Sequence, residues 1–110
     1  VSHGGGYLPS YAGRMDHAYH ARADVREGLP HPPSYYLKQF YFDTVVFEPD
    51  QLNFLISKFG GDHILLGTDY PYDMGEEDPI GLLSKVPNLS ETDRALIEGK
   101  TASNLLKLRN

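Results

Sequence analysis

The sequence predicts an α/β fold in which parallel strands are joined by crossover helices. Short apolar or β-branched runs alternate along the chain with segments whose apolar residues recur at helical spacing. The run 64–66 contains no polar residue, which is typical of a strand buried on both faces of a parallel sheet. Each of the expected strands ends beside a glycine or an acid, where such folds place their functional groups.

The length limits how much of such a fold the chain can form. The chain has 110 residues, whereas an eight-stranded α/β barrel takes about 250. Because the few expected strands cannot close a barrel, we expect residues 1–110 to be one segment of a single larger domain. No internal repeat, low-complexity tract or linker divides this segment.

The composition argues against several partners and chemistries. A formal net charge of −5 gives no broad attraction for nucleic acid or anionic membranes. The chain has no cysteine, so a metal would need histidine and carboxylate ligands. No apolar run approaches the roughly 20 residues of a membrane helix, and the N-terminal residues lack a secretory signal pattern. We therefore expect a cytoplasmic protein without nucleic-acid or membrane partners.

The N-terminal third is predicted to contain a strand end and a helix. Val1–His3 is predicted to end a strand that runs into the glycine loop Gly4–Gly6, with His3 at the strand tip. A stripe of residues at helical spacing then predicts a helix that Gly28 ends. The stripe consists of Tyr11, Met15, Ala18, Arg22 and Val25. The proline-rich segment 30–33 is a stiff connector.

Two strands and a helix are predicted in the middle of the chain. The aromatic and β-branched segment 35–47 favours a strand centred on residues 39–43. Pro49 at a first helical position and the apolar stripe after it predict an amphipathic helix that stops at Gly60. The apolar run within residues 63–67 then predicts the next strand.

The last third is predicted to be helical. An acidic loop over residues 73–79 leads to a short helix over 80–86. Ser90 and an acid three residues later form an N-terminal capping signature for a helix that ends near Gly99. Apolar residues at 102, 105 and 106 indicate a terminal helix.

Three side chains at strand ends are candidates for functional roles. Asp69 follows the buried run, where a carboxylate binds a metal or caps the next turn. His3 is either an acid/base or a histidine satisfied by the backbone. Asp43 has either a supporting role at the site or a role in its own turn.

Two arginines and four histidines complete the list of candidates. Arg14 and Arg22 are either solvated charges on a helix face or, because they lie on or beside the apolar stripe, partly buried residues that bind a carboxylate or a partner chain. His17 and His20 have a His-x-x-His spacing that would allow metal binding on one helical face, but a solvated helix face is the simpler interpretation. The remaining histidines at 31 and 63 are expected to be structural or surface residues.

These motifs, taken together, resemble the C-terminal part of the amidohydrolase superfamily. The resemblance rests on His3–Gly6, Gly13–Arg14, Arg22, 32–35, Phe42–Asp43 and above all Leu66–Pro71, in the same order. It is closest to the branch of aminocarboxymuconate-semialdehyde decarboxylase-like enzymes. It implies a distorted (β/α)8 TIM barrel, to which residues 1–110 supply about the last three βα units and the terminal helices.

The resemblance also implies a metal site and roles for its residues. Asp69 corresponds to the metal ligand at the tip of the last strand, and the ion is zinc, with manganese as the alternative. His3 corresponds to the acid/base histidine beside the metal, so His3 and Asp69 are the expected catalytic residues. Arg14 corresponds to an arginine that binds a substrate carboxylate at a neighbouring subunit's site, which implies a homodimer. Arg22 is a second substrate or interface candidate.

The activity implied is that of a metal-dependent decarboxylase acting on a small unsaturated or aromatic carboxylate. A metal-dependent hydrolase of the same superfamily is the first alternative. The second is a non-catalytic fragment or binding module, because the family's His-x-His pair has no counterpart in residues 1–110; the isolated segment is expected to be inactive. The third is a serine hydrolase, since His3–Gly6 resembles an oxyanion-hole motif, but the chain has no Gly-x-Ser-x-Gly elbow.

Overall fold

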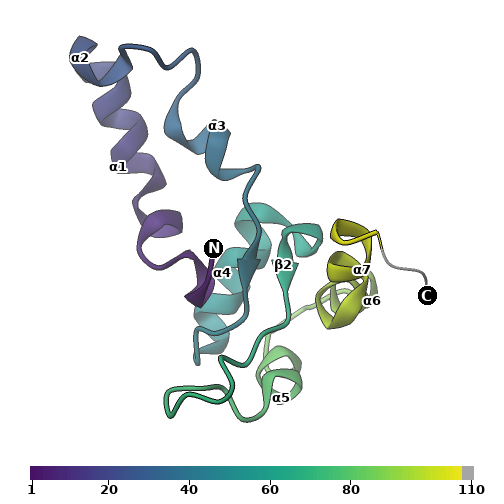
Figure 1. Ribbon diagram of the computed structural model, residues 1–110. Helices are drawn as coiled ribbons and strands as arrows, with labels where there is room; N and C mark the ends of the chain where they lie inside the picture. The colour runs from purple at the N-terminus through teal and green to yellow at the C-terminus, as the bar shows by residue number, and fades with distance from the viewer. Residues whose placement is uncertain (108–110) are drawn as a thin grey trace.

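A pair of parallel strands lies at the centre of the computed structural model, which describes residues 1–107 (Figure 1). β1 (Phe42–Asp43) and β2 (Ile64–Leu65) form this pair, with Phe42 opposite Ile64 and Asp43 opposite Leu65. Because the strands are parallel, the segments that follow them leave the sheet at the same edge. That edge carries the candidate site.

Helices and helical turns surround the strand pair. In chain order they are η1 (His3–Gly5), α1 (Leu8–Ala21), α2 (Ala23–Arg26), α3 (Pro33–Leu37), α4 (Pro49–Phe59), η2 (Gly61–His63), α5 (Pro79–Ser84), α6 (Glu91–Ala95), η3 (Leu96–Lys100) and α7 (Thr101–Leu105). None of the helices in the described part of the chain is long and apolar enough to cross a membrane.

The crossover helix α4 joins the two strands and confirms the predicted strand–helix–strand unit. It starts at Pro49, whose missing N–H is not needed in a first helical turn, and ends at Gly60, which has a φ of 87°. Its inner face consists of Leu52, Leu55 and Ile56, which are all buried. The helix predicted after Pro49 is therefore confirmed at both ends.

The hydrophobic core lies between the sheet, α4 and the C-terminal helices. Its buried members are Phe42, Leu52, Leu55, Ile56, Ile64, Leu82, Leu83, Val86 and Ile97. Full burial of one such side chain contributes on the order of 1.5–3 kcal/mol. Because both strands supply fully buried residues to this cluster, the core fixes the strand ends relative to the helices.

Side-chain caps start the C-terminal helices where the sequence predicts them. At the start of α5 the Asp78 carboxylate accepts the Gly81 N–H at 2.9 Å. At the start of α6 the Ser90 hydroxyl accepts the Asp93 N–H at 3.0 Å, as the capping signature predicts.

The terminal helical segment is tied to the turn before β2. α6 runs through the π-helical turn η3 into α7, and the chain departs from helical geometry at Gly99, near the predicted helix end. The buried hydroxyl of Thr101 then donates to the Gly61 carbonyl at 2.8 Å. This contact joins the C-terminal helices to η2.

Residues 8–37, called the arm below, project from the sheet as α1, α2 and α3 (Figure 1). α1 and α3 pack against each other, and Asp16 on α1 accepts both the N–H of Ser34, at 2.9 Å, and its hydroxyl. Desolvation acts to raise the pKa of Asp16, but the hydrogen bonds from Ser34 and the electrostatic attraction of His20 and Lys58 together hold this pKa below its usual value. The Tyr19 hydroxyl also donates to the Leu29 carbonyl at 2.9 Å.

The first predicted strand is wrong. Val1 and Ser2 belong to no strand, and the turn η1 begins at His3. The left-handed backbone of His3 and of the glycines that follow turns the chain away from an extended course. The segment still lies beside β1, because the Val1 amine donates to the Tyr41 carbonyl at 2.6 Å.

Two other predicted boundaries need correction. The strand expected over residues 35–47 is confined to β1, and its first residues belong to α3 instead. Pro33 fixes a helical φ at the start of α3, and Asp16 accepts the Ser34 N–H that a helix start leaves without an intrahelical partner. The first helix also ends earlier than expected, because Arg22 is extended, with φ −127°, and separates α1 from α2.

Candidate active site

The turn after β2 places Asp69. The buried Thr44 hydroxyl accepts the Gly67 N–H at 3.1 Å, which keeps the chain beside β1 beyond the end of β2. The Thr68 hydroxyl then accepts the Tyr70 N–H at 3.2 Å and closes a tight turn around Asp69, whose φ is 62°. The carboxylate is thereby presented at the carboxyl edge of the strand pair, as the sequence predicts.

The glycine loop places His3 at the same edge. His3, Gly4 and Gly5 have φ values of 54°, 61° and 83°. Glycine adopts this left-handed conformation readily, whereas residues with a side chain rarely do. A Cβ on Gly4 would overlap Val46, and one on Gly5 would lie 2.6 Å from the ring of Phe42. At Gly4 and Gly5 the loop therefore packs directly on the β1 region and leaves no room for a side chain.

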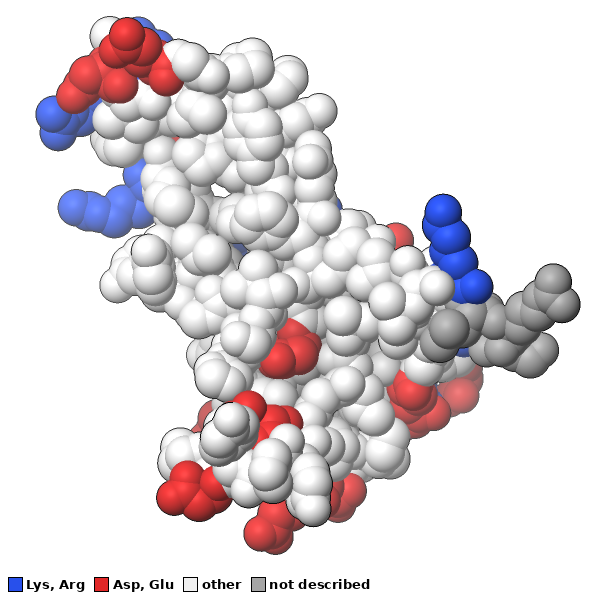
Figure 2. Space-filling model, viewed as in Figure 1, with Lys and Arg blue, Asp and Glu red and all other residues white. Residues whose placement is uncertain are grey.

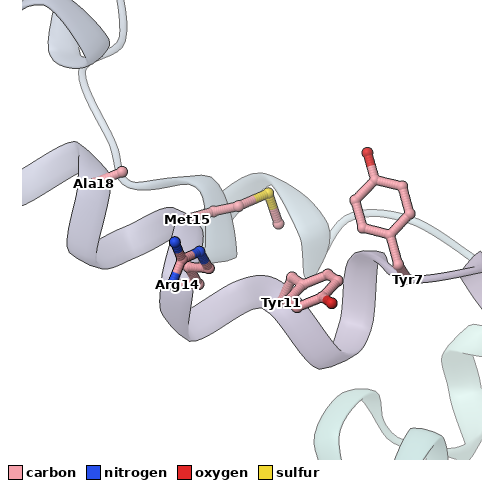
Figure 3. A pocket seen from close by; sticks show the side chains of 5 residues that line it. All are labelled: Tyr7, Tyr11, Arg14, Met15 and Ala18. Carbon is pink, nitrogen blue, oxygen red and sulfur yellow. The ribbon is translucent and has the colours of Figure 1, made fainter.

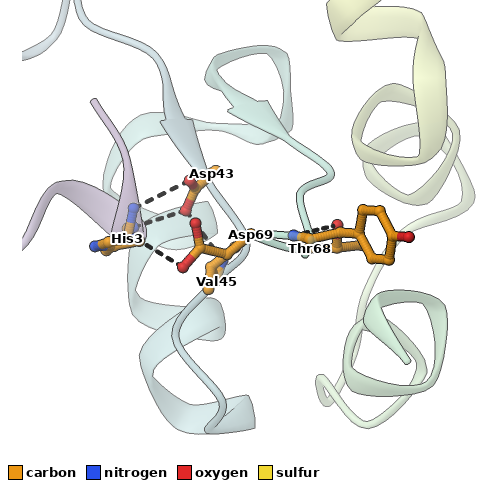
Figure 4. Close-up of polar contacts among 7 residues, drawn as sticks. His3, Asp43, Val45, Thr68 and Asp69 are labelled. Atoms are coloured by element: carbon orange, nitrogen blue, oxygen red, sulfur yellow. Dashed lines mark hydrogen bonds and ion pairs between the residues drawn. The ribbon is translucent and has the colours of Figure 1, made fainter. Parts of the chain in front are cut away.

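Asp43 at the tip of β1 holds this loop by its backbone. Its Oδ2 accepts the His3 N–H at 3.0 Å, and its Oδ1 accepts the Gly4 N–H at 2.9 Å and the Val45 N–H at 3.0 Å (Figure 4). The sequence placed Asp43 at a strand tip and left its role open between a supporting acid and a turn residue. The structure shows both roles for Asp43. Its bond to the Val45 N–H closes the turn that follows β1, and its bonds to the His3 and Gly4 N–H groups hold the glycine loop.

The structure brings His3 and Asp69 together. The Nε2 atom of His3 lies 3.4 Å from Oδ2 of Asp69, and the two side chains are 59% and 28% exposed (Figure 4). An imidazole beside a carboxylate and open to an approaching ligand has the chemistry of a general acid or base, since its ring nitrogens can both give and take a proton.

The N–H groups of the glycine loop are already paired within the protein. The Gly4 N–H donates to Asp43, the Gly5 N–H to the Ser2 carbonyl at 3.0 Å, and the Gly6 N–H to the His3 carbonyl at 3.1 Å. An oxyanion hole needs N–H groups directed at the ligand. The serine-hydrolase interpretation therefore lacks its donors as well as its nucleophile elbow.

Both candidate arginines lie on the arm, and their predicted partial burial is wrong. Arg14 is exposed and lines a groove of about 390 Å³ together with Tyr7, Tyr11, Met15 and Ala18 (Figure 3). All of these residues belong to α1 or to the residue before it.

Arg22 is exposed as well and makes a surface ion pair with Asp24 at 3.3 Å. The helix α1 belongs to the arm, which projects away from the strand pair (Figure 1). Within residues 1–107 neither Arg14 nor Arg22 forms an ion pair with Asp69.

The described residues contain no group of three or more histidine, aspartate or glutamate side chains that could together hold a metal. Asp69 contributes a single partly exposed carboxylate, an oxygen donor that both zinc and manganese accept. Residues 1–107 can therefore supply a ligand to a metal site but not the complete set.

The other histidines lie outside this pair. His17 and His20 are exposed on α1, in agreement with a solvated helix face. His31 stacks on a tyrosine ring with centroids 4.0 Å apart. His63 places Nδ1 2.8 Å from a backbone carbonyl, as expected of a structural residue.

Acidic side chains lie at the end of the molecule that carries the loop after β2 and also at the tip of the arm, where basic side chains lie beside them (Figure 2). This loop contributes the acids Asp73, Glu76, Glu77 and Asp78. A carboxylate ligand approaching His3 would be repelled by Asp69, whose carboxylate lies 3.4 Å away. A cation at the site, from a metal or an arginine, would offset that repulsion.

Nearly the whole of this chain is similar in sequence and in structure to known proteins. The profile of a family described as amidohydrolase matches residues 1–108. The 2-amino-3-carboxymuconate-6-semialdehyde decarboxylase of Dictyostelium discoideum is 35% identical over 108 residues, which are 97% of this chain and 30% of the relative. The chain thus spans about a third of the length of the curated relatives it matches.

Solved decarboxylases share the arrangement of the elements. A 2,6-dihydroxybenzoate decarboxylase complexed with 2,6-dihydroxybenzoate superposes with a TM-score of 0.81 at 27% identity, covering 97% of this chain and 33% of the other. A dihydroxybenzoic acid decarboxylase from Polaromonas sp. JS666, with bound manganese and the inhibitor 2-nitroresorcinol, gives a TM-score of 0.72 at 30% identity and covers 96% and 32%.

Proposed function

The chain belongs to the amidohydrolase family, and from this premise we propose that it forms the C-terminal part of a metal-dependent decarboxylase. The proposed substrate is a small unsaturated or aromatic carboxylate. The similar proteins described above are decarboxylases, which favours carbon–carbon cleavage over the hydrolase alternative. The proposed fold is a (β/α)8 barrel, in which β1, α4 and β2 form part of the last βα units.

The observation that carries this proposal is the His3–Asp69 pair. The two residues lie 66 positions apart in the chain (69 − 3), yet Nε2 and Oδ2 come within 3.4 Å at the carboxyl edge of parallel strands. Barrels of this class carry their chemistry at that edge. The pair therefore lies where a barrel active site belongs.

Asp69 is the proposed ligand of a divalent ion, zinc first and manganese as the alternative. A partly exposed carboxylate at a strand end suits either ion, and the manganese-bound relative supports the second. The remaining ligands would come from the rest of the barrel. When bound, such an ion supplies Lewis-acid polarisation of a substrate oxygen.

His3 is the proposed acid/base. Its Nε2 would deliver one proton to the substrate carbon that bears the carboxylate. The bond between that carbon and the carboxylate then breaks, carbon dioxide leaves, and the electron pair of the broken bond returns to the substrate framework. Asp69, 3.4 Å from Nε2, would hold the ring at the edge of the strand pair where the substrate is proposed to bind.

Arg14 is the proposed binder of a substrate carboxylate, with Arg22 as a second candidate. Arg14 is exposed on a projecting arm, which suits a residue that reaches the site of a neighbouring subunit in a homodimer. A homodimer and a cytoplasmic location belong to this proposal, and sedimentation and fractionation of the complete protein check them.

The test is Asp69→Asn in a polypeptide that carries the complete barrel. We expect bound divalent metal, measured by elemental analysis, and carbon dioxide release from a panel of aromatic and unsaturated carboxylates to fall together, by about a hundredfold or more. Asp73→Asn, in the same loop, is the matched control and should keep both. Full retention of metal and activity in Asp69→Asn would contradict the ligand assignment.

His3→Ala separates the acid/base from the metal ligand. We expect its activity to fall by about a hundredfold to ten-thousandfold while the metal content stays at that of the parent. His17→Ala, an exposed histidine on α1, is the control and should behave as the parent does. An unchanged rate in His3→Ala would remove His3 from the mechanism.

A further inference from the structure

The carboxylate of Asp43 accepts hydrogen bonds from three backbone N–H groups. Both of its oxygens accept N–H groups, from His3, Gly4 and Val45, at 2.9–3.0 Å. The Val45 bond fixes the carboxylate to the end of its own strand. The bonds to His3 and Gly4 reach a segment about 40 residues earlier in the chain, so one side chain couples the tip of β1 to the glycine loop.

The glycine loop has few other anchors. The side chain of His3 is mostly exposed, and Gly4 and Gly5 have no side chain to bury. His3 has the same left-handed backbone as these glycines. A residue with a side chain does not prefer this conformation, so the surroundings must impose it. The contacts that impose it include the two hydrogen bonds to the Asp43 carboxylate, the bonds from Gly5 and Gly6 to the preceding backbone carbonyls, and the close packing against Val46 and Phe42.

The position of the loop decides where the imidazole of His3 lies. Proton transfer requires the acid within hydrogen-bond reach of the reacting atom, and a displacement of about 1 Å costs about a hundredfold in rate. We propose that Asp43 is a positioning residue, which holds the backbone of His3 so that its ring faces Asp69 and the substrate. This proposal rests on the acid/base function proposed above for His3.

Asp43→Asn in the complete enzyme is the first measurement. An asparagine keeps the size of the side chain but offers one acceptor oxygen in place of two. It can therefore no longer accept hydrogen bonds on both oxygens, from His3 and from Gly4, which together are called the clamp below. We expect kcat to fall by about tenfold to a hundredfold, with KM within about twofold and the metal content unchanged. Asp78→Asn is the matched control, because Asp78 also accepts a backbone N–H, at 2.9 Å, but caps α5 instead. Its kcat should equal that of the parent.

A double variant distinguishes positioning from a general loss of structure. If Asp43 acts through His3, then Asp43→Asn should have no further effect on kcat once His3→Ala is present, because the group being positioned is gone. The same fold-loss in both backgrounds would overturn the proposal, and so would an Asp43→Asn enzyme with the parent kcat.

Hydrogen exchange of the His3 and Gly4 amides tests the clamp independently of activity. In the complete protein we expect these amides to exchange at least tenfold faster in Asp43→Asn than in the parent, and at the parent rate in Asp78→Asn. Unchanged exchange in Asp43→Asn would overturn the proposal. If the parent decarboxylates none of the carboxylates tested, the proposed function fails, while faster exchange would still establish the hold on His3.

Discussion

At the scale of single residues, left-handed backbone marks the candidate site. His3 and Asp69 have φ values of 54° and 62°, and such a conformation costs an ordinary L-residue roughly 1–2 kcal/mol. Each cost is offset by hydrogen bonds, from the backbone of His3 to the distant Asp43 and through Thr68 within the turn around Asp69. Both candidate side chains therefore depend on neighbours that fix the backbone.

Gly4→Ala tests how strictly the loop is constrained. The new Cβ would overlap Val46 at a φ of 61°, so we expect the free energy of unfolding to fall by about 1–3 kcal/mol. Gly13→Ala is the matched control, because a Cβ there meets nothing within 4 Å. In the interior of α1 it should raise stability by about 0.5–1 kcal/mol. Urea denaturation measures both, and equal effects of the two substitutions would contradict this account.

The candidate residues differ in how far the sequence could predict them. Asp69 follows the run that forms β2, which is a local signal, whereas His3 was expected at the end of a strand that the structure does not have, and only the glycine run after it is a local signal. The clamp by Asp43 joins residues about 40 positions apart, so no local pattern reveals it. The burial expected for Arg14 and Arg22 is wrong because amphipathic spacing does not say whether a helix packs on the sheet or projects from it.

At the scale of elements, the contact between Asp16 and Ser34 joins the helices α1 and α3 of the arm. Asp16 accepts two hydrogen bonds from Ser34, and its pKa is lower in the folded protein than its usual value. A carboxyl group with a lowered pKa stabilises the folded state above its unfolded pKa. That stabilisation is lost as the pH falls through the folded pKa.

Asp16→Asn should therefore have a pH-dependent effect. At neutral pH we expect it to lower the free energy of unfolding by about 1 kcal/mol, and at about pH 3 the difference from the parent should shrink. Asp24→Asn is the control, since Asp24 makes only a surface ion pair with Arg22, and it should change stability by less than about 0.5 kcal/mol. A deficit in Asp16→Asn that is constant with pH would exclude this role for the carboxylate.

The elements also differ in how well local sequence determines them. α4 was predicted correctly because Pro49, its apolar stripe and Gly60 agree with one another. Segment 35–47 was predicted as one strand because of its aromatic residues, but contact with Asp16 and the preceding prolines form α3 there. Tertiary contact thus overrides β-propensity where the propensity signal is the only one.

At the scale of the whole molecule, the metal site should require the complete barrel. Residues 1–107 contain no group of three potential ligands, so a polypeptide of residues 1–110 alone should bind zinc about a hundredfold or more weaker than the complete protein. Equilibrium dialysis measures this, with circular dichroism to show that the segment is folded. Binding as tight as in the complete protein, and unaffected by Asp69→Asn, would contradict the ligand assignment.

The long sequence separation of the contacts around His3 has a consequence for the order of folding. α4 needs only local contacts and can form within microseconds, whereas the bonds from His3 to Asp43 and from Thr101 to Gly61 each close a loop of 40 residues. Closing such loops costs chain entropy before any contact is gained. The His3–Asp69 pair is therefore assembled late, so a nascent or partly folded chain would have its helices before it had any capacity for chemistry.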